Sequence, residues 1–198
     1  MWSFERDALK KGCRVIAGID EAGRGPLAGP VISGAVVLPF DFPDPGITDS
    51  KKLSPQKREQ FFSIIMKNAV SVSTGRADPN EIDRINILQA SLRSMERAVH
   101  TLSVVPDYLL IDGQFTIHSD IPQKALIKGD SRSISIAAAS IIAKVTRDAI
   151  MRKIHFCYPE YGFDRHKGYP TKLHREALVK LGPCPWHRKS FKGVKQGG

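Results

Sequence analysis

Residues 15–37 read VIAGIDEAGRGPLAGPVISGAVV and predict two apolar strands joined by a glycine-rich loop. The runs 14–19 and 30–38 are typical of buried strands, and the short connection favours antiparallel pairing. Asp20 and Glu21 come directly after the first run. Because successive side chains point to opposite faces of a strand, we expect both acids to lie at the strand exit, where the pleat relaxes and the carboxylates can converge.

Two adjacent carboxylates in a buried setting repel each other and need a neutralising partner. A hard divalent cation with oxygen ligands, Mg²⁺ or Mn²⁺, meets this need. The glycines at 23, 25 and 29 leave backbone N–H groups accessible to a ligand. Carboxylates that can bind a metal ion, next to free backbone N–H groups that can bind an anion, indicate chemistry on a phosphate group.

Two further acids, Asp112 and Asp130, each come at or just after the end of a short apolar run. Open α/β sheets gather the ends of their strands at one edge, so the four acids can meet although they are distant in sequence. They are therefore candidates for holding two divalent ions around a scissile phosphate. Each has a simpler alternative: Asp112 begins an Asp-Gly turn signal, and Asp130 could cap the helix that follows it.

Helices and strands alternate along the rest of the chain. Helices are expected at 55–68, 88–102, 133–156 and 171–181, and strands at 70–76, 107–113 and 125–127. Residues 78–81, Asp-Pro-Asn-Glu, resemble a capping box that starts a short helical turn. An antiparallel pair followed by helix-separated strands indicates an α/β protein with a mixed sheet, which we expect to form one domain over residues 1–198.

The charge is uneven along the 198 residues, whose formal net charge is +10. Residues 144–198 carry 13 Lys and Arg against 4 Asp and Glu, whereas the part that carries the acids is nearly neutral. This layout is expected of a nuclease, although a solvated basic surface without a partner is the alternative. The three cysteines are scattered and no long apolar run occurs, so we expect no disulfide framework, zinc site, signal peptide or membrane span, and a cytoplasmic location.

The motifs together resemble bacterial ribonuclease HII, the type 2 ribonuclease H, over nearly the whole chain. The matching blocks, in the family's order, are GIDEAGRGP at 18–26, DSKKL at 49–53, IDG at 111–113, KGD at 128–130, SIAAAS at 135–140 through Arg147-Asp148, and HKGYPT at 166–171. The resemblance implies a ribonuclease-H-like fold, with a five-stranded mixed sheet flanked by helices and a basic C-terminal helical region at about 144–198.

The resemblance also implies an activity. It implies endonucleolytic hydrolysis of RNA in RNA/DNA hybrids and nicking of duplex DNA 5′ of a single embedded ribonucleotide, leaving 5′-phosphate and 3′-hydroxyl ends. The implied catalytic and metal-binding residues, for two Mn²⁺ or Mg²⁺ ions, are Asp20, Glu21, Asp112 and Asp130. Gly23, Arg24 and Gly25 match the loop that senses the ribose 2′-hydroxyl, and Tyr169 matches a tyrosine that stacks at the RNA–DNA junction.

Other residues are candidate substrate contacts, each with an ordinary alternative. Lys51 and Lys52 precede a predicted helix N-terminus, which favours phosphate, or they form a solvated pair. Arg24 could brace a phosphate or form a surface ion pair. Tyr169 could instead be a half-buried core tyrosine. A row on the long helix suggests that this helix lies along the duplex, and histidines of the basic region could touch phosphates, although surface or hydrogen-bonded histidines are commoner. The row comprises Lys144, Arg147 and Met151, and the histidines are His155, His166, His174 and His187.

Two other readings remain open at this point. Ribonuclease HIII shares the fold and similar acids, but that family carries an extra N-terminal domain, for which the 13 residues before Arg14 leave no room. A non-catalytic protein that binds hybrids through the basic region is the second, and it would gain nothing from carboxylates facing phosphate. The sequence identifies no protein partner, and a monomer is the expectation.

Overall fold

The computed structural model describes residues 1–43, 46–48, 50 and 53–194. Lys51 and Lys52, both candidate phosphate contacts, lie outside the described residues. The helices are α1 (Ser3–Lys10), α2 (Pro55–Asn68), α3 (Pro79–His100), α4 (Ile134–Cys157), α5 (Phe163–His166) and α6 (Lys172–Leu181), with 3₁₀ turns η1 (Gly129–Ser131) and η2 (Pro159–Tyr161). The strands are β1 (Ile16–Ala22), β2 (Val31–Val37), β3 (Ser71–Ala77), β4 (Tyr108–Asp112) and β5 (Gln123–Leu126).

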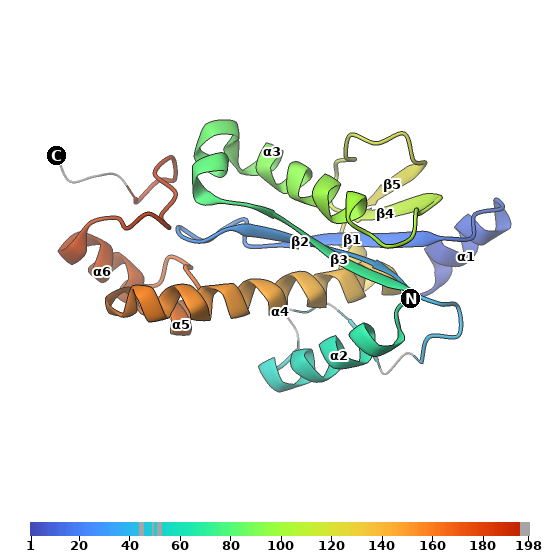
Figure 1. Cartoon of the computed structure of the whole chain (residues 1–198), viewed down its shortest axis with the longest axis horizontal. Coiled ribbons are helices and arrows are strands. Elements are labelled where there is room, and N and C mark those ends of the chain that lie inside the picture. Colours follow the sequence, from blue (N-terminus) through green and yellow to red (C-terminus); the bar gives the residue numbers. More distant parts are fainter. Residues whose placement is uncertain (44–45, 49, 51–52, 195–198) are drawn as a thin grey trace.

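The five strands form one mixed sheet in the order β3-β2-β1-β4-β5. β2 is antiparallel to β1 and to β3, whereas β4 is parallel to β1 and to β5. Helix α3 covers one face of the sheet, and α4 and α2 lie on the other (Figure 1). The predicted mixed sheet with helices on its faces is thus confirmed, as is the antiparallel pairing of the first two strands.

Glycines in three strands let the two long helices approach the sheet closely. A Cβ on Gly18 or Gly34 would lie 2.0 Å from the Ser135 carbonyl carbon or 2.5 Å from the Ala139 oxygen, both in α4. A Cβ on Gly75 would lie 1.9 Å from the Ser94 oxygen in α3. Interiors are close-packed, so these positions set the distance between each helix and the sheet.

The start of α4 is fixed by two caps, and one of them was not expected. Ser133 is its N-cap and accepts a hydrogen bond from the Ile136 N–H. The buried carboxylate of Glu5, in α1, accepts hydrogen bonds from the Ser133 hydroxyl at 2.6 Å and the Ser135 N–H at 3.1 Å. A carboxylate is favourable at a helix N-terminus, so α1 is tied to α4 by a contact that sequence pattern did not predict.

Helix α3 consists of a short helical segment followed by a longer one, as expected from residues 78–81 and 88–102. The two segments meet at Asn86, whose φ of 66° breaks the helical geometry. Its N-cap Asp78 makes no side-chain capping bond and pairs instead with Arg76 at 2.5 Å, while Glu81 pairs with Arg97. The capping box is therefore wrong, because nearby arginines compete for both acids.

The C-terminal part lies at one end of the elongated molecule, beyond the ends of strands β1 and β2 (Figure 1). There η2, α5 and α6 enclose an aromatic cluster in which the Tyr161 and Phe163 rings stack with centroids 5.4 Å apart. None of the helices in the described ranges has the length and apolar character to cross a bilayer.

Candidate active site

Asp20 and Glu21 lie inside β1, not beyond its end. They pair with Gly34 and Ser33 of β2, so the prediction that they sit at the strand exit is wrong. On the other side of β1, the last pair with β4 joins Ile19 to Ile111. Asp112 is the next residue of β4 and is therefore level with Asp20, so the sheet itself brings two of the four acids together.

The two carboxylates of β1 are buried and repel their neighbours. The pKa of Asp20 is raised well above its ordinary value by burial and by the charges of Glu21 and Asp112. Hydrogen bonds from the Glu21 N–H and the Ser140 hydroxyl lower this pKa but do not outweigh the rise. The pKa of Glu21 is also raised, mainly by burial, although the nearby Arg24 guanidinium opposes this. Such a site favours any species that brings positive charge.

The other two acids belong to segments that meet at the end of the parallel strands. Asp112 accepts a hydrogen bond of 2.6 Å from the Gly129 N–H, and Asp130 is the next residue, buried in η1. Asp130 does not cap α4, because Ser133 does. The helix-cap alternative for Asp130 is therefore wrong, and Asp112 is the last residue of β4 rather than part of a free turn.

The donor set suits a hard divalent cation. Carboxylate and hydroxyl oxygens are the ligands that Mg²⁺ and Mn²⁺ prefer, and the raised pKa values mark an unmet need for positive charge. Within the described residues, no three Asp, Glu, His or Cys side chains stand close enough to hold an ion as they are. The acids instead take protein partners: Asp112 takes the Gly129 N–H, and Glu21 pairs with Arg24 at 3.3 Å.

The loop that follows β1 meets Tyr169. Gly23 has a φ of +102°, a conformation that a side chain would oppose. A Cβ on Gly25 would have the Tyr169 ring, at 4.0 Å, as its nearest neighbour. Two regions that are 144 positions apart in sequence thus line the same place. Arg24 forms the ion pair with Glu21 that was its ordinary alternative.

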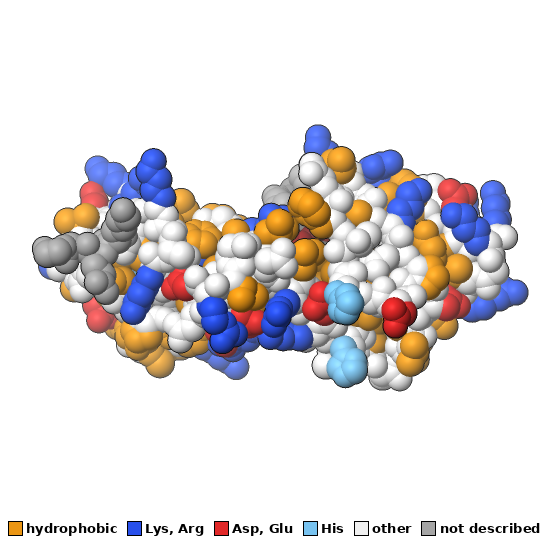
Figure 2. All heavy atoms as spheres, turned by 90° about the horizontal axis from the view of Figure 1, so that it is seen from above, with side chains coloured by type: hydrophobic (Ala, Val, Ile, Leu, Met, Phe, Trp, Pro, Cys, Tyr) orange, Lys and Arg blue, Asp and Glu red, His pale blue; other side chains and the backbone are white. Residues whose placement is uncertain are grey.

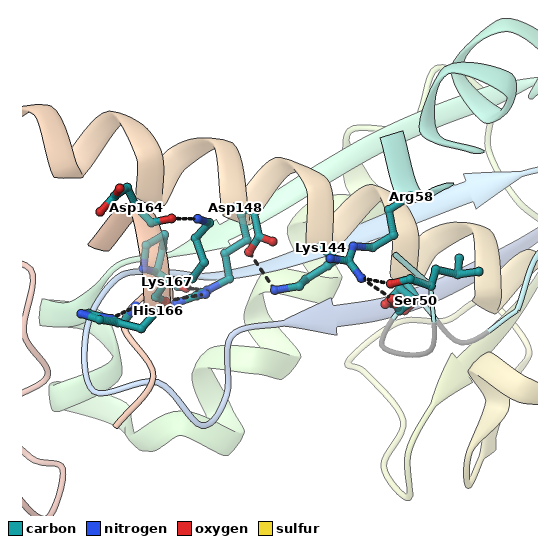
Figure 3. Close-up of polar contacts among 12 residues, drawn as sticks. Ser50, Arg58, Lys144, Asp148, Asp164, His166 and Lys167 are labelled. Atoms are coloured by element: carbon teal, nitrogen blue, oxygen red, sulfur yellow. Dashed lines mark hydrogen bonds and ion pairs between the residues drawn. The ribbon is translucent and has the colours of Figure 1, made fainter. Parts of the chain in front are cut away.

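Tyr169 is 41% exposed, so it is not a core tyrosine. The Lys144 ammonium lies 5.9 Å from the centre of its ring and pairs with Asp148 at 2.8 Å. Figure 3 shows Lys144 and Asp148 projecting from the same side of α4, with Lys167 beside Asp148. A partly exposed ring beside a lysine can stack on a sugar or base while the ammonium meets a phosphate.

A hydrogen-bonded chain that was not predicted joins the loop before α2 to Asp20. Arg58 donates to the Ser50 carbonyl (Figure 3) and to the Leu53 carbonyl. The Ser50 and Ser140 hydroxyls lie 2.7 Å apart, and the Ser140 hydroxyl in turn lowers the pKa of Asp20. Both serines lie in blocks that carry the family resemblance, DSKKL at 49–53 and SIAAAS at 135–140, but local pattern does not predict that they meet.

Several candidate substrate contacts are wrong because the side chains are buried. Arg147 and Met151 are fully buried, so of the row on α4 only Lys144 reaches the surface. His166, His174 and His187 are buried and hydrogen-bonded internally, which was their commoner alternative. His155 is partly exposed and lies 3.3 Å from Asp164. The basic residues from Lys144 onward are thus of two kinds: some are buried and hold the fold together, and others reach the surface, where they can meet a substrate.

The surface is indented between the C-terminal part and the body of the sheet, with Lys and Arg side chains around both parts (Figure 2). The loop of residues 23–30 and Tyr169 belong to the contact between these parts, because the Leu27 N–H donates to the Gly168 carbonyl at 2.8 Å. The site therefore lies where a basic lobe meets an acid-bearing sheet edge.

Known proteins match this chain over nearly its full length. The ribonuclease HII family profile matches residues 17–194. The chain is 56% identical to ribonuclease HII of Geobacter metallireducens over 99% of this chain and 92% of that protein, and 55% identical to ribonuclease HII of Bacillus licheniformis over 98% and 76%. Ribonuclease H2 of Pyrococcus horikoshii has a similar structure, with a TM-score of 0.77, 28% identity and coverage of 92% of this chain and 96% of that one. The Mn²⁺ complex of a ribonuclease HIII shares the fold, with a TM-score of 0.69 and 19% identity. That match covers 91% of this chain and 68% of the ribonuclease HIII chain. The chain therefore belongs to the ribonuclease HII family and is an endoribonuclease of the ribonuclease H type.

Proposed function

We propose that this protein hydrolyses the RNA strand of RNA/DNA hybrids and nicks duplex DNA on the 5′ side of single embedded ribonucleotides, leaving 5′-phosphate and 3′-hydroxyl ends. The metal ligands in this proposal are Asp20, Glu21, Asp112 and Asp130. When bound, two divalent ions would polarise the scissile phosphate and acidify the attacking water. Mg²⁺ and Mn²⁺ both suit these ligands.

One observation carries the proposal: the Tyr169 ring lies next to Gly25. Gly25 belongs to the loop that begins at Gly23, two residues after Glu21. A protein that recognises one ribonucleotide in DNA must contact the 2′-hydroxyl, the only group that distinguishes the two sugars. Backbone groups of a glycine turn can reach this hydroxyl, and the adjacent ring can stack on the sugar or base beside it. The recognition loop follows Asp20 and Glu21 directly in the chain, so a bound ribose would have its phosphate near these carboxylates.

The proposed roles do not require a protein nucleophile. Asp20, Glu21, Asp112 and Asp130 would bind ions, the residues 23–25 would orient the ribose, and Lys144 would meet a phosphate beside Tyr169. Lys51 and Lys52 remain proposed phosphate contacts. These parts together favour a hydrolase over a protein that only binds hybrids.

The test uses a labelled duplex that contains one ribonucleotide, incubated with Mg²⁺, with Mn²⁺ or with EDTA. The wild-type protein is expected to nick it on the 5′ side only when a divalent ion is present. Asp112→Asn removes one ligand charge, and we expect cleavage to fall at least about a hundredfold while binding in EDTA is kept. Asp120→Asn is the matched control, because Asp120 is an exposed acid.

Three results would overturn all or part of the proposal. Retarded but uncut duplex with either metal would indicate a non-catalytic binder. Full cleavage by Asp112→Asn would remove the metal-site assignment. Cleavage of long hybrids without nicking at a single ribonucleotide would overturn the proposed recognition of single ribonucleotides but not the proposed nuclease activity on hybrids.

A further inference from the structure

Two arginines are fully buried in the contact between the C-terminal part and the β1–β2 loop. Arg147 comes from α4 and Arg188 from the segment after α6, and both are 0% exposed. Neither forms an ion pair with an acid in the part of the chain that the structure describes. Burial lowers the pKa of Arg147 to about 10, and burial with the nearby Arg147 charge lowers the pKa of Arg188 to about 9. Buried charges are costly, so these need another source of compensation.

The compensation comes from main-chain carbonyls, most of them in the loop. Arg188 donates to the carbonyls of Gly23 at 2.6 Å, Arg24 at 2.9 Å and Gly29 at 2.9 and 3.0 Å. Arg147 donates to the carbonyls of Ala28, Pro30 and Lys167. The loop thus turns its oxygens inward onto two guanidinium groups, which present several donors in a fixed planar arrangement.

This arrangement fixes where the loop points its N–H groups. In a trans peptide the C=O and the N–H of the next residue point in opposite directions. The Gly23 and Arg24 carbonyls point to Arg188, so the N–H groups of Arg24 and Gly25 point away from it. Neither N–H has a hydrogen-bond acceptor among the described residues. Two adjacent free donors therefore lie in the loop beside the Tyr169 ring.

We infer that Arg188 is a positioning residue for sugar discrimination, because it holds the Gly23 and Arg24 peptides so that the Arg24 and Gly25 N–H groups face the ribose 2′-hydroxyl. This inference rests on the proposed function of the loop and names the side chain that makes it work. Arg188 does not touch the substrate. Its effect is to keep two donors at the place where the hydroxyl oxygen binds.

The experiment compares binding of two duplexes that differ at a single sugar. The dissociation constants of a duplex with one ribonucleotide and of the same duplex in DNA alone are measured by fluorescence anisotropy in EDTA. Arg188→Lys keeps the charge but loses the planar set of donors. We expect the ribose-over-deoxyribose selectivity of the variant to fall by about threefold to tenfold, through weaker binding of the ribonucleotide duplex only.

The ratio separates positioning from a general loss of folded protein, because an inactive fraction weakens both apparent affinities alike. Arg97→Lys is the matched control: Arg97 also donates to a main-chain carbonyl, that of Arg76, but lies on α3 away from the loop. It is expected to keep wild-type selectivity. Wild-type selectivity in Arg188→Lys would overturn the inference alone, whereas absence of selectivity in the wild type would overturn the proposed function of the loop.

A second measurement applies if Arg188→Lys does not fold. In ¹⁵N-labelled wild-type protein, the Arg24 and Gly25 amide resonances should shift with the ribonucleotide duplex by clearly more than with the DNA duplex. Equal shifts with both duplexes would overturn the proposed function of the loop, and with it the inference, because the two N–H groups would then not report on the hydroxyl.

Discussion

Gly23 and Gly25 stand two positions apart, yet a methyl group would meet different surroundings at each. At Gly23, with φ of +102°, the added carbon would lie 2.1 Å from the buried Arg147 side chain. At Gly25 it would meet only the edge of the Tyr169 ring, at 4.0 Å. One glycine is thus required by packing and backbone conformation, and the other leaves room that the fold does not use.

We expect Gly25→Ala to keep its free energy of unfolding within about 0.5 kcal/mol of wild type and to lose about tenfold in cleavage at a single ribonucleotide, because the methyl group narrows the space beside Tyr169. Gly23→Ala should lose about 2–4 kcal/mol of stability. Urea unfolding and cleavage rates measured on both variants check this pair. Unchanged cleavage by a well-folded Gly25→Ala would show that the space is not part of the site.

At the scale of elements, the separation of α3 from the sheet depends on Gly75. Its Cβ would lie 1.9 Å from the Ser94 oxygen and 2.6 Å from the Ala98 nitrogen, both backbone atoms of α3. Gly75→Ala must therefore displace the helix, and we expect a loss of about 2–4 kcal/mol in the free energy of unfolding. Urea unfolding measures the loss, with Gly25→Ala as the glycine-to-alanine control. A stability equal to wild type would mean that α3 does not pack as described.

The elements were largely predictable, whereas two of the site's details were not. Apolar runs and caps such as Ser54 located α2 from Pro55 to Asn68, and the acids were found because each lies at or near the end of an apolar strand. Whether Asp20 lies inside or beyond a strand depends on how far β2 continues its pairing, which local pattern does not encode. Likewise the burial of Arg188 depends on carbonyls more than 150 positions away in sequence. The local sequence around Arg188 therefore resembles that of an exposed arginine.

At the scale of the molecule, three buried histidines join the C-terminal segments to one another. The Cys184 N–H donates to His187 Nδ1, so His187 donates through Nε2 to His174 Nε2 at 3.0 Å. His174 then donates through Nδ1 to the Tyr169 carbonyl at 2.9 Å, and His166 stacks on it with ring centroids 4.4 Å apart. Each link needs a neutral ring. A second proton on His174 Nε2 would face the His187 Nε2–H, and one on His187 Nδ1 would face the Cys184 N–H, so either would set two donors against each other.

Acid should therefore loosen this part of the protein. Burial lowers the pKa of His174 and of His187 to about 4, below the ordinary value of 6.5, so the unfolded chain binds more protons between these values. Stability is fully present above about pH 6.5 and is lost as the pH falls toward 4. Between pH 7 and pH 5 we expect a loss of about 2–4 kcal/mol in urea unfolding.

The variants identify the source of this loss. His174→Gln should show a markedly smaller difference between pH 7 and pH 5 than wild type. His118→Gln, which changes an exposed histidine, should keep the wild-type difference. A His174→Gln protein with the full wild-type pH dependence would place the titrating groups elsewhere.

The dependence of residues 23–30 on Arg147 and Arg188 also sets an order of events during synthesis. The strands that carry Asp20 and Asp112 leave the ribosome well before Arg188 does, because it follows them by 76 positions or more. Until that arginine emerges, the carbonyls of Gly23 and Arg24 have no cation to face. We expect a nascent or prematurely terminated chain to hold its carboxylates without the ability to tell one sugar from the other.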